Sequence, residues 1–209
     1  MKITSLTLSV LVTILVFSSC KKDSTSNDPA PPTESDEQMS PASGKITHYL
    51  FNGNTRDTSG NGQHGGEAGS IAFGADRFNR ASRALELSGN NSNFETRGLK
   101  ATFPFSISFW MNSANAASVS SLFTADRLTS GYYGYWLQQS IASPNKLAFS
   151  IGDGTGTSGS ARNSLLSSVS LASNQWYHIV INVRGANDMD LYINGTRDNA
   201  ATYDGSATS

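Results

Sequence analysis

Two-residue alternation of apolar and polar side chains is the feature that most constrains this chain. In residues 105–112 every odd-numbered position is apolar, and residues 177–183 repeat the pattern. This period fits a β-strand that buries one face, whereas no apolar pattern at helical spacing extends beyond two turns in residues 45–209. The chain is therefore expected to fold as antiparallel strands around a core.

Shorter runs of the same kind complete the predicted strands. They are Ile46–Phe51, Ala84–Leu87, Val119–Phe123, Tyr132–Leu137, Lys146–Ile151 and Met189–Ile193. Glycine takes the positive φ that tight turns need, and three pairs separate or bound these strands: Asn61-Gly62, Asn194-Gly195 and Asp204-Gly205. Many short strands in one domain predict a β-sandwich or barrel.

A short apolar run near the N-terminus, residues 6–17, leads to Cys20, the only cysteine. The run is too brief to span a bilayer and is typical of a signal peptide. Residues 16–20 resemble a bacterial lipobox, which implies that 1–19 are a lipoprotein signal peptide and that Cys20 carries the lipid. The alternative is a secretory leader that is cleaved further downstream. With one cysteine, the domain can form no internal disulfide.

Residues 20–44 are polar and offer almost nothing to bury. Such a segment cannot offset its ordering entropy, so we expect a lipid-anchored, disordered tether that holds the domain roughly 25 to 30 Å from the membrane. The charged residues 21–23 resemble those of Bacteroidetes lipoproteins, which implies an outer-membrane location, exposed at the cell surface. A net charge of −1 with scattered basic residues provides no surface for nucleic acid.

Four segments resemble, in order and spacing, a laminin-G-like jelly-roll domain of the concanavalin A-like lectin/glucanase superfamily. They are residues 49–65, 83–89, 105–111, and 176–180 followed by 191–195. The resemblance implies an all-β antiparallel sandwich over residues 45–209 and structural roles for Trp110 and Trp176.

Members of that family end with a further strand pair, whereas this chain stops at Ser209, soon after the Asn194-Gly195 turn. We therefore expect the domain to be incomplete at its C-terminus, with roughly 30 to 50 residues and the closing strands missing. A sandwich without those strands would expose an unpaired edge.

Two binding sites are expected. The oxygen-rich loop 52–65 resembles a region that holds calcium in related domains, with Asp57 and Asn61 as the ligands for Ca²⁺. In the alternative, Asp57 hydrogen-bonds backbone amides and binds nothing. Sugars pack on aromatic rings beside polar groups, which makes a second segment a candidate for carbohydrate binding, although core packing is the alternative for each ring. The residues of this second segment are Tyr132, Tyr133, Tyr135 and Trp136.

Catalysis is not expected. Glucanases of the superfamily carry a Glu-x-Asp-x-x-Glu strand, and no glutamate of the domain begins one. Asp188 and Asp190 do alternate, but in a strand that the family uses structurally. The sequence thus predicts a non-catalytic, lipid-anchored recognition module that binds carbohydrate or a surface protein. Alternatives are a glycoside hydrolase or lyase, and a structural or adhesion protein of the envelope.

Overall fold

The computed structural model describes residues 43–69, 71–88, 92–96, 102–118, 121–125 and 131–206. The predicted signal peptide, Cys20 and the tether up to residue 42 lie outside this part of the chain. All described strands belong to one compact unit, Gly44–Ser209. In the described ranges, no helix has the length and apolar character needed to cross a membrane.

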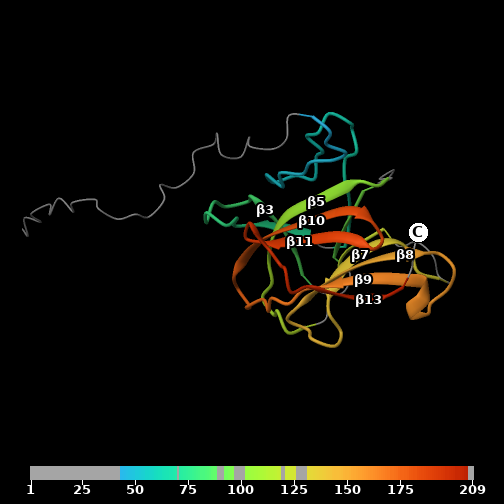
Figure 1. The fold of residues 1–209 in the computed structure, drawn as a ribbon. Coiled ribbons are helices and arrows are strands. Elements are labelled where there is room, and N and C mark those ends of the chain that lie inside the picture. The colour runs from blue at the N-terminus through green and yellow to red at the C-terminus, as the bar shows by residue number, and fades with distance from the viewer. Residues whose placement is uncertain are drawn as a thin grey trace, which may run out of the picture. The chain divides into compact units, whose positions relative to one another are not determined.

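Two antiparallel sheets form the body of this unit and lie as stacked layers (Figure 1). The four-stranded sheet has the order β12 (Thr196–Arg197), β11 (Asp188–Ile193), β10 (Trp176–Gly185), β5 (Phe105–Asn112). The five-stranded sheet has the order β13 (Thr202–Gly205), β9 (Arg162–Leu166), β8 (Leu147–Asp153), β7 (Tyr133–Gln139), β6 (Ser121–Thr124). A single turn of 3₁₀ helix, Gly159–Ala161, precedes β9.

The core lies between these sheets and is built by the alternating positions. Ile179, Ile181 and Val183 of β10 are fully buried, and Leu137 and Phe149 face them from the five-stranded sheet. Burying each such side chain contributes about 1.5 to 3 kcal/mol. The predicted all-β antiparallel sandwich is therefore confirmed.

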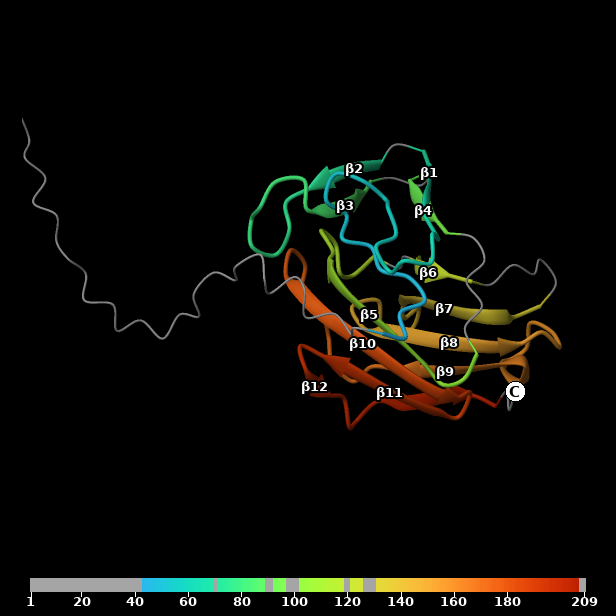
Figure 2. The same cartoon turned by 90° about the horizontal axis from the view of Figure 1, so that it is seen from above.

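Two smaller ladders accompany the sandwich. Strand β1 (Gly66–Ala68) pairs with β4 (Asn93–Glu95), and β2 (Ile71–Gly74) pairs with β3 (Ala84–Leu87). Figure 2 shows both ladders outside the two main sheets. None of their described side chains belongs to the buried core. Among described strands, β5 pairs only with β10 and β6 only with β7, so each main sheet has an edge strand facing this side.

Most predicted strands are present. The ranges Ala84–Leu87 and 105–112 coincide with β3 and β5, and those over 132–137, 146–151 and 189–193 are β7, β8 and β11 with ends shifted by one or two residues. Val119 lies outside the described residues, and β6 begins at Ser121. Strands β1, β2, β4, β9, β12 and β13 were not predicted.

The prediction of a strand over Ile46–Phe51 is wrong. This segment forms only one isolated bridge, between Tyr49 and Asp57. Phe51 has a φ of 54°, which is left-handed and breaks an extended run. The aromatic rings instead gather locally, with Tyr49 and Phe51 each packing edge-on against Phe94 at 4.8 and 5.4 Å.

Of the predicted turns, one forms as expected and another belongs to a strand. Asn194 and Gly195 have φ values of 52° and 78° and join β11 to β12 as a two-residue hairpin loop. Asp204-Gly205 is instead part of β13, where it pairs with Ser164 and Asn163 of β9. Continuation of the domain beyond Ser209 stays a prediction.

Candidate functional site

The loop of the predicted calcium site is held together by the carboxylate of Asp57. Its Oδ1 accepts hydrogen bonds from the backbone amides of His48 and Ser59, at 2.9 and 2.8 Å. Its Oδ2 accepts from the Ser59 hydroxyl at 2.8 Å and the Gln63 amide at 2.9 Å. Burial alone would raise the pKa of Asp57, but these hydrogen bonds outweigh it and hold the pKa well below its ordinary value.

Asn61 serves the same loop. Its Nδ2 donates to the carbonyl oxygens of Lys45 and Ile46, at 2.7 and 3.0 Å. Within the described ranges, no group of three or more His, Cys, Asp and Glu side chains could hold a metal ion. This is the geometry of the alternative, in which Asp57 orders backbone amides, and calcium binding by Asp57 and Asn61 stays a prediction.

The predicted carbohydrate residues divide between the two faces of β7. Tyr135 points into the core, where its ring centroid is 6.3 Å from those of Phe123 and Phe149, and burial raises its pKa. Trp136 points outward but is only 8 % exposed, because the Tyr132 ring stacks on it at 5.3 Å. Tyr132 and Trp136 therefore contact each other on the outer face of the five-stranded sheet.

Neighbouring residues complete this aromatic stack. The Arg162 guanidinium lies over the Tyr132 ring at 5.4 Å and forms an ion pair with Asp204 at 3.4 Å. Gly152 is required beneath the stack, because a Cβ there would lie 2.5 Å from the carbonyl carbon of Tyr132. Tyr133, at 54 % exposure, is the one predicted residue that stays open to solvent. On this face, the rings of Trp136 and Tyr132 are thus largely covered by other side chains of the protein.

The outer face of the four-stranded sheet carries a different aromatic group. Trp110 of β5 and His178 of β10 are register partners, and their rings stack at 4.9 Å with 18° between planes. Trp110 remains 43 % exposed, and the Arg77 guanidinium lies 4.5 Å from its ring centroid. A hollow of about 460 Å³ opens beside them, lined by Trp110, Trp176, His178, Asn194 and Gly195.

The imidazole of His178 is held in its neutral form. Burial lowers its pKa, and the positive charge of Arg77 lowers it further. Its Nε2 lies 2.9 Å from the Ser108 hydroxyl, and its backbone amide donates to Oδ1 of Asn194 at 2.9 Å. Trp110 therefore stands against a fixed, uncharged ring.

Sequence reasoning gave Trp110 and Trp176 structural roles and so missed this hollow. The alternation of the strands could have revealed it. Trp110 and Trp176 are chain neighbours of the buried residues Met111 and Tyr177, so their side chains point to the outer face of the sheet. Two large aromatic residues at outward positions of paired strands can form one contiguous apolar patch, and such a patch can mark a contact surface.

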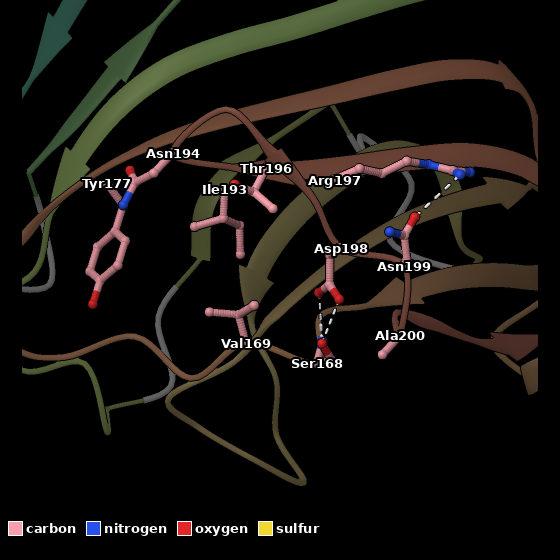
Figure 3. Close-up of a pocket in the computed structure, with 10 residues that line it drawn as sticks. All are labelled: Ser168, Val169, Tyr177, Ile193, Asn194, Thr196, Arg197, Asp198, Asn199 and Ala200. Atoms are coloured by element: carbon pink, nitrogen blue, oxygen red, sulfur yellow. Dashed lines mark hydrogen bonds between the residues drawn. The ribbon is translucent and has the colours of Figure 1, made fainter.

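A second hollow of about 480 Å³ shares Asn194 with the first (Figure 3). Val169, Tyr177 and Ile193 contribute its apolar lining. Asn194, Thr196 and Asn199 add amide and hydroxyl groups. Asp198 also lines it and fixes the neighbouring loop, since its carboxylate accepts from the Ser168 amide at 2.7 Å and from the Ser168 hydroxyl.

A family model of the laminin G type, described as the concanavalin A-like lectin/glucanases superfamily, matches residues 86–209. The chain belongs to this superfamily. The match covers β4 to β13 and both hollows, and begins after the predicted calcium loop. No curated protein and no solved structure matches the chain. The superfamily name includes both lectins and glucanases, so the family alone does not distinguish binding from hydrolysis.

Asp188 and Asp190 are the acidic pair that a glucanase of this superfamily could use here. Arg184 contacts both carboxylates, Asp188 at 2.6 Å and Asp190 at 2.9 Å, and Arg197 contacts Asp190 at 2.5 Å. The hydrogen bonds from Arg184 lower the pKa of both aspartates, and Arg197 lowers that of Asp190 further. A glycosidase general acid needs the opposite shift, since it must hold a proton near neutral pH.

Proposed function

We propose that this chain is a non-catalytic, lipid-anchored recognition module that binds carbohydrate through the outer face of its four-stranded sheet. The observation that carries the proposal is Trp110, which is 43 % exposed at the edge of a hollow that Trp176 and Asn194 also line. A pyranose ring presents C–H groups that pack on aromatic rings, and its hydroxyls bond to amides.

The rigidity of this face supports the proposal. His178 stacks on Trp110 and is itself hydrogen-bonded to Ser108, while its backbone amide fixes the side chain of Asn194. A preorganised surface loses little conformational entropy when a ligand binds. The hollow therefore offers fixed aromatic and amide groups to a sugar.

The Tyr132–Trp136 face is the weaker candidate for the same role. The rings of Tyr135 and Trp136 are already covered by the core and by Tyr132, respectively. Tyr132 and Tyr133 could still touch a ligand at the rim. The preference for the Trp110 face rests on the 43 % exposure that this residue keeps beside His178 and Arg77, and on the hollow next to it.

A non-catalytic role is favoured because Asp188 and Asp190 are neutralised by arginines. The test is incubation of the full chain with plant and algal polysaccharides. We expect no released oligosaccharide, and turnover that disappears in Asp188→Asn or Asp190→Asn would instead support a glycoside hydrolase or lyase.

Binding is tested on a glycan array with the full chain, the Trp110→Ala variant and Tyr133→Ala as the matched control from the other sheet. We expect binding by the wild type and the control, and a loss of roughly 30-fold or more in Trp110→Ala, the size of an interface hot spot. Absence of glycan binding together with capture of a surface protein would contradict the sugar proposal. Equal binding by Trp110→Ala would contradict the site.

The membrane anchor is a separate part of the proposal. It rests on the lipobox-like residues 16–20 and the polar segment that follows. Mass spectrometry of the mature protein should find acyl chains on Cys20, and Cys20→Ser should move the protein out of the outer-membrane fraction. An unmodified thiol in the wild type would contradict the anchor and leave the binding site unaffected.

A further inference from the structure

The two hollows meet at one turn. Asn194 lines both of them, and its neighbour Gly195 lines the hollow beside Trp110. Trp176 and Tyr177 are neighbours in β10 with opposite orientations, so that Trp176 lines the hollow on the outer face and Tyr177 lines the second one. The same short segment of chain therefore builds both hollows.

Two hydrogen bonds between Asn194 and His178 hold the turn in place. The backbone amide of Asn194 donates to the His178 carbonyl at 2.8 Å. The side-chain Oδ1 of Asn194 accepts from the backbone amide of His178 at 2.9 Å. Apart from Gly195 and its two chain neighbours, no heavy atom lies within 4 Å of the place where a Cβ of Gly195 would stand, so no other residue covers this position. In the described part of the chain, Nδ2 of Asn194 has no hydrogen-bond partner and can donate to a ligand oxygen.

The second hollow has the same chemistry as the first. Tyr177 forms an ordered floor, because its hydroxyl accepts from the Ala172 amide at 2.9 Å and donates to Oε1 of Gln175 at 3.1 Å. Val169 is 38 % exposed, and Thr196 and Asn199 are polar residues of the same lining. Apolar walls with a few polar groups are what a sugar subsite needs.

We propose that the two hollows are successive subsites of one groove, and that the ligand is an internal stretch of a linear polysaccharide that crosses the Asn194-Gly195 turn. This inference rests on the proposed function and specifies its ligand. A module that bound a terminal sugar would need only one of the two hollows, which have similar volumes of about 460 and 480 Å³.

The test is calorimetric titration of the full chain with ladders of cello-, laminari-, xylo- and manno-oligosaccharides, from disaccharide to octasaccharide. In the ladder that binds, affinity should rise with length until the oligosaccharide fills both hollows, by roughly tenfold or more over the disaccharide. Val169→Arg, which fills only the second hollow, should reduce the affinity of long oligosaccharides to that of short ones. It should leave disaccharide binding unchanged.

The outcomes separate the two claims. An affinity that is already complete at the disaccharide, or long-chain binding that Val169→Arg leaves unchanged, overturns the two-subsite groove while the Trp110 site stands. The length series needs no variant, so it decides the question even if Val169→Arg does not fold. Unchanged affinity in Trp110→Ala overturns the proposed site and the groove with it. Binding on the glycan array without binding of any of the four ladders overturns the linear-polysaccharide ligand and leaves the proposed function standing.

Discussion

The two outer faces of the sandwich use tryptophan in opposite ways. On the five-stranded sheet, Trp136 lies under Tyr132 and is 8 % exposed, so its ring contacts the protein. On the four-stranded sheet, Trp110 is supported by His178 but remains 43 % exposed beside a hollow. The first arrangement stabilises the fold, and the second leaves a ring available to a ligand.

The difference teaches that aromatic density in a sequence does not locate a binding surface. The Tyr-rich segment 132–136 is the densest aromatic cluster in the chain, yet its rings largely satisfy one another. The outward ring of Trp110 has fewer aromatic neighbours in sequence and is far more exposed than that of Trp136. Variants of the two tryptophans should therefore separate stability from binding.

The largest expected effect is on the five-stranded face. Trp136→Ala removes a nearly buried ring and should lower the free energy of unfolding by about 3 kcal/mol, measured by urea denaturation. Trp110→Ala, the matched control, should lower it by less than about 1 kcal/mol because the ring is half in solvent. Equal losses in the two variants would abolish the distinction between the faces.

The loop held by Asp57 provides the next effect. Asp57→Asn should lower the free energy of unfolding by about 1 to 2 kcal/mol, because an amide cannot accept all four hydrogen bonds. Since folding lowers the pKa of Asp57 from its ordinary 3.8, its contribution is complete above that pH and is lost as the pH falls below it. Thermal unfolding of both proteins as a function of pH measures this, and a wild type without the acid-dependent loss would contradict it.

Calcium titration of the same two proteins distinguishes the two uses of Asp57. A midpoint of thermal unfolding that rises with calcium in the wild type, but not in Asp57→Asn, supports the ligand role of Asp57 and Asn61. A midpoint that calcium leaves unchanged supports the role of Asp57 in ordering the loop.

A smaller effect concerns acidity and the four-stranded face. Folding lowers the pKa of His178 from its ordinary 6.5, so the neutral imidazole is favoured above that pH and its contribution is lost as the pH falls below it. Glycan affinity should fall roughly tenfold as the pH is lowered below 6.5 and the imidazole becomes protonated, and His178→Gln should remove most of this dependence. His48→Gln, the control in the distant loop, should keep it, and an identical pH profile in all three proteins would contradict the role of His178.

The smallest effect is expected at Tyr133. Its side chain is the most exposed of the predicted carbohydrate residues, and Tyr133→Ala should change the free energy of unfolding by less than about 0.5 kcal/mol. Glycan affinity should also stay unchanged. A loss of affinity here would move the site to the five-stranded face.

The sequence predicted the parts of the fold in which burial and alternation coincide. Strands β5 and β10 were readable because their inward residues are all apolar. Strand β9 was not, because Asn163 and Ser164 are both buried although they are polar. They form hydrogen bonds that only the folded chain creates, from Nδ2 of Asn163 to the Ala186 carbonyl at 2.8 Å and between the hydroxyls of Ser164 and Ser150 at 2.7 Å, while Oδ1 of Asn163 is buried without a partner among the described residues.

The candidate site was only partly predictable for a related reason. Trp110, Trp176 and Asn194 are far apart in the chain, and the pairing of β10 with both β5 and β11 brings them together. Strand alternation could place the two tryptophans outward, but the hollow depends on the turn at Asn194-Gly195. Sequence proximity instead favoured the segment 132–136.

The indole N–H signals of the three tryptophans provide the most direct test of the central claim. They are Trp110, Trp136 and Trp176. Assigned by single substitution and followed by NMR while a glycan from the array is added to the full chain, the signals of Trp110 and Trp176 should shift with saturation and that of Trp136 should not. A shift of Trp136 alone, or no shift of Trp110 at saturating glycan, would contradict carbohydrate binding on the four-stranded face.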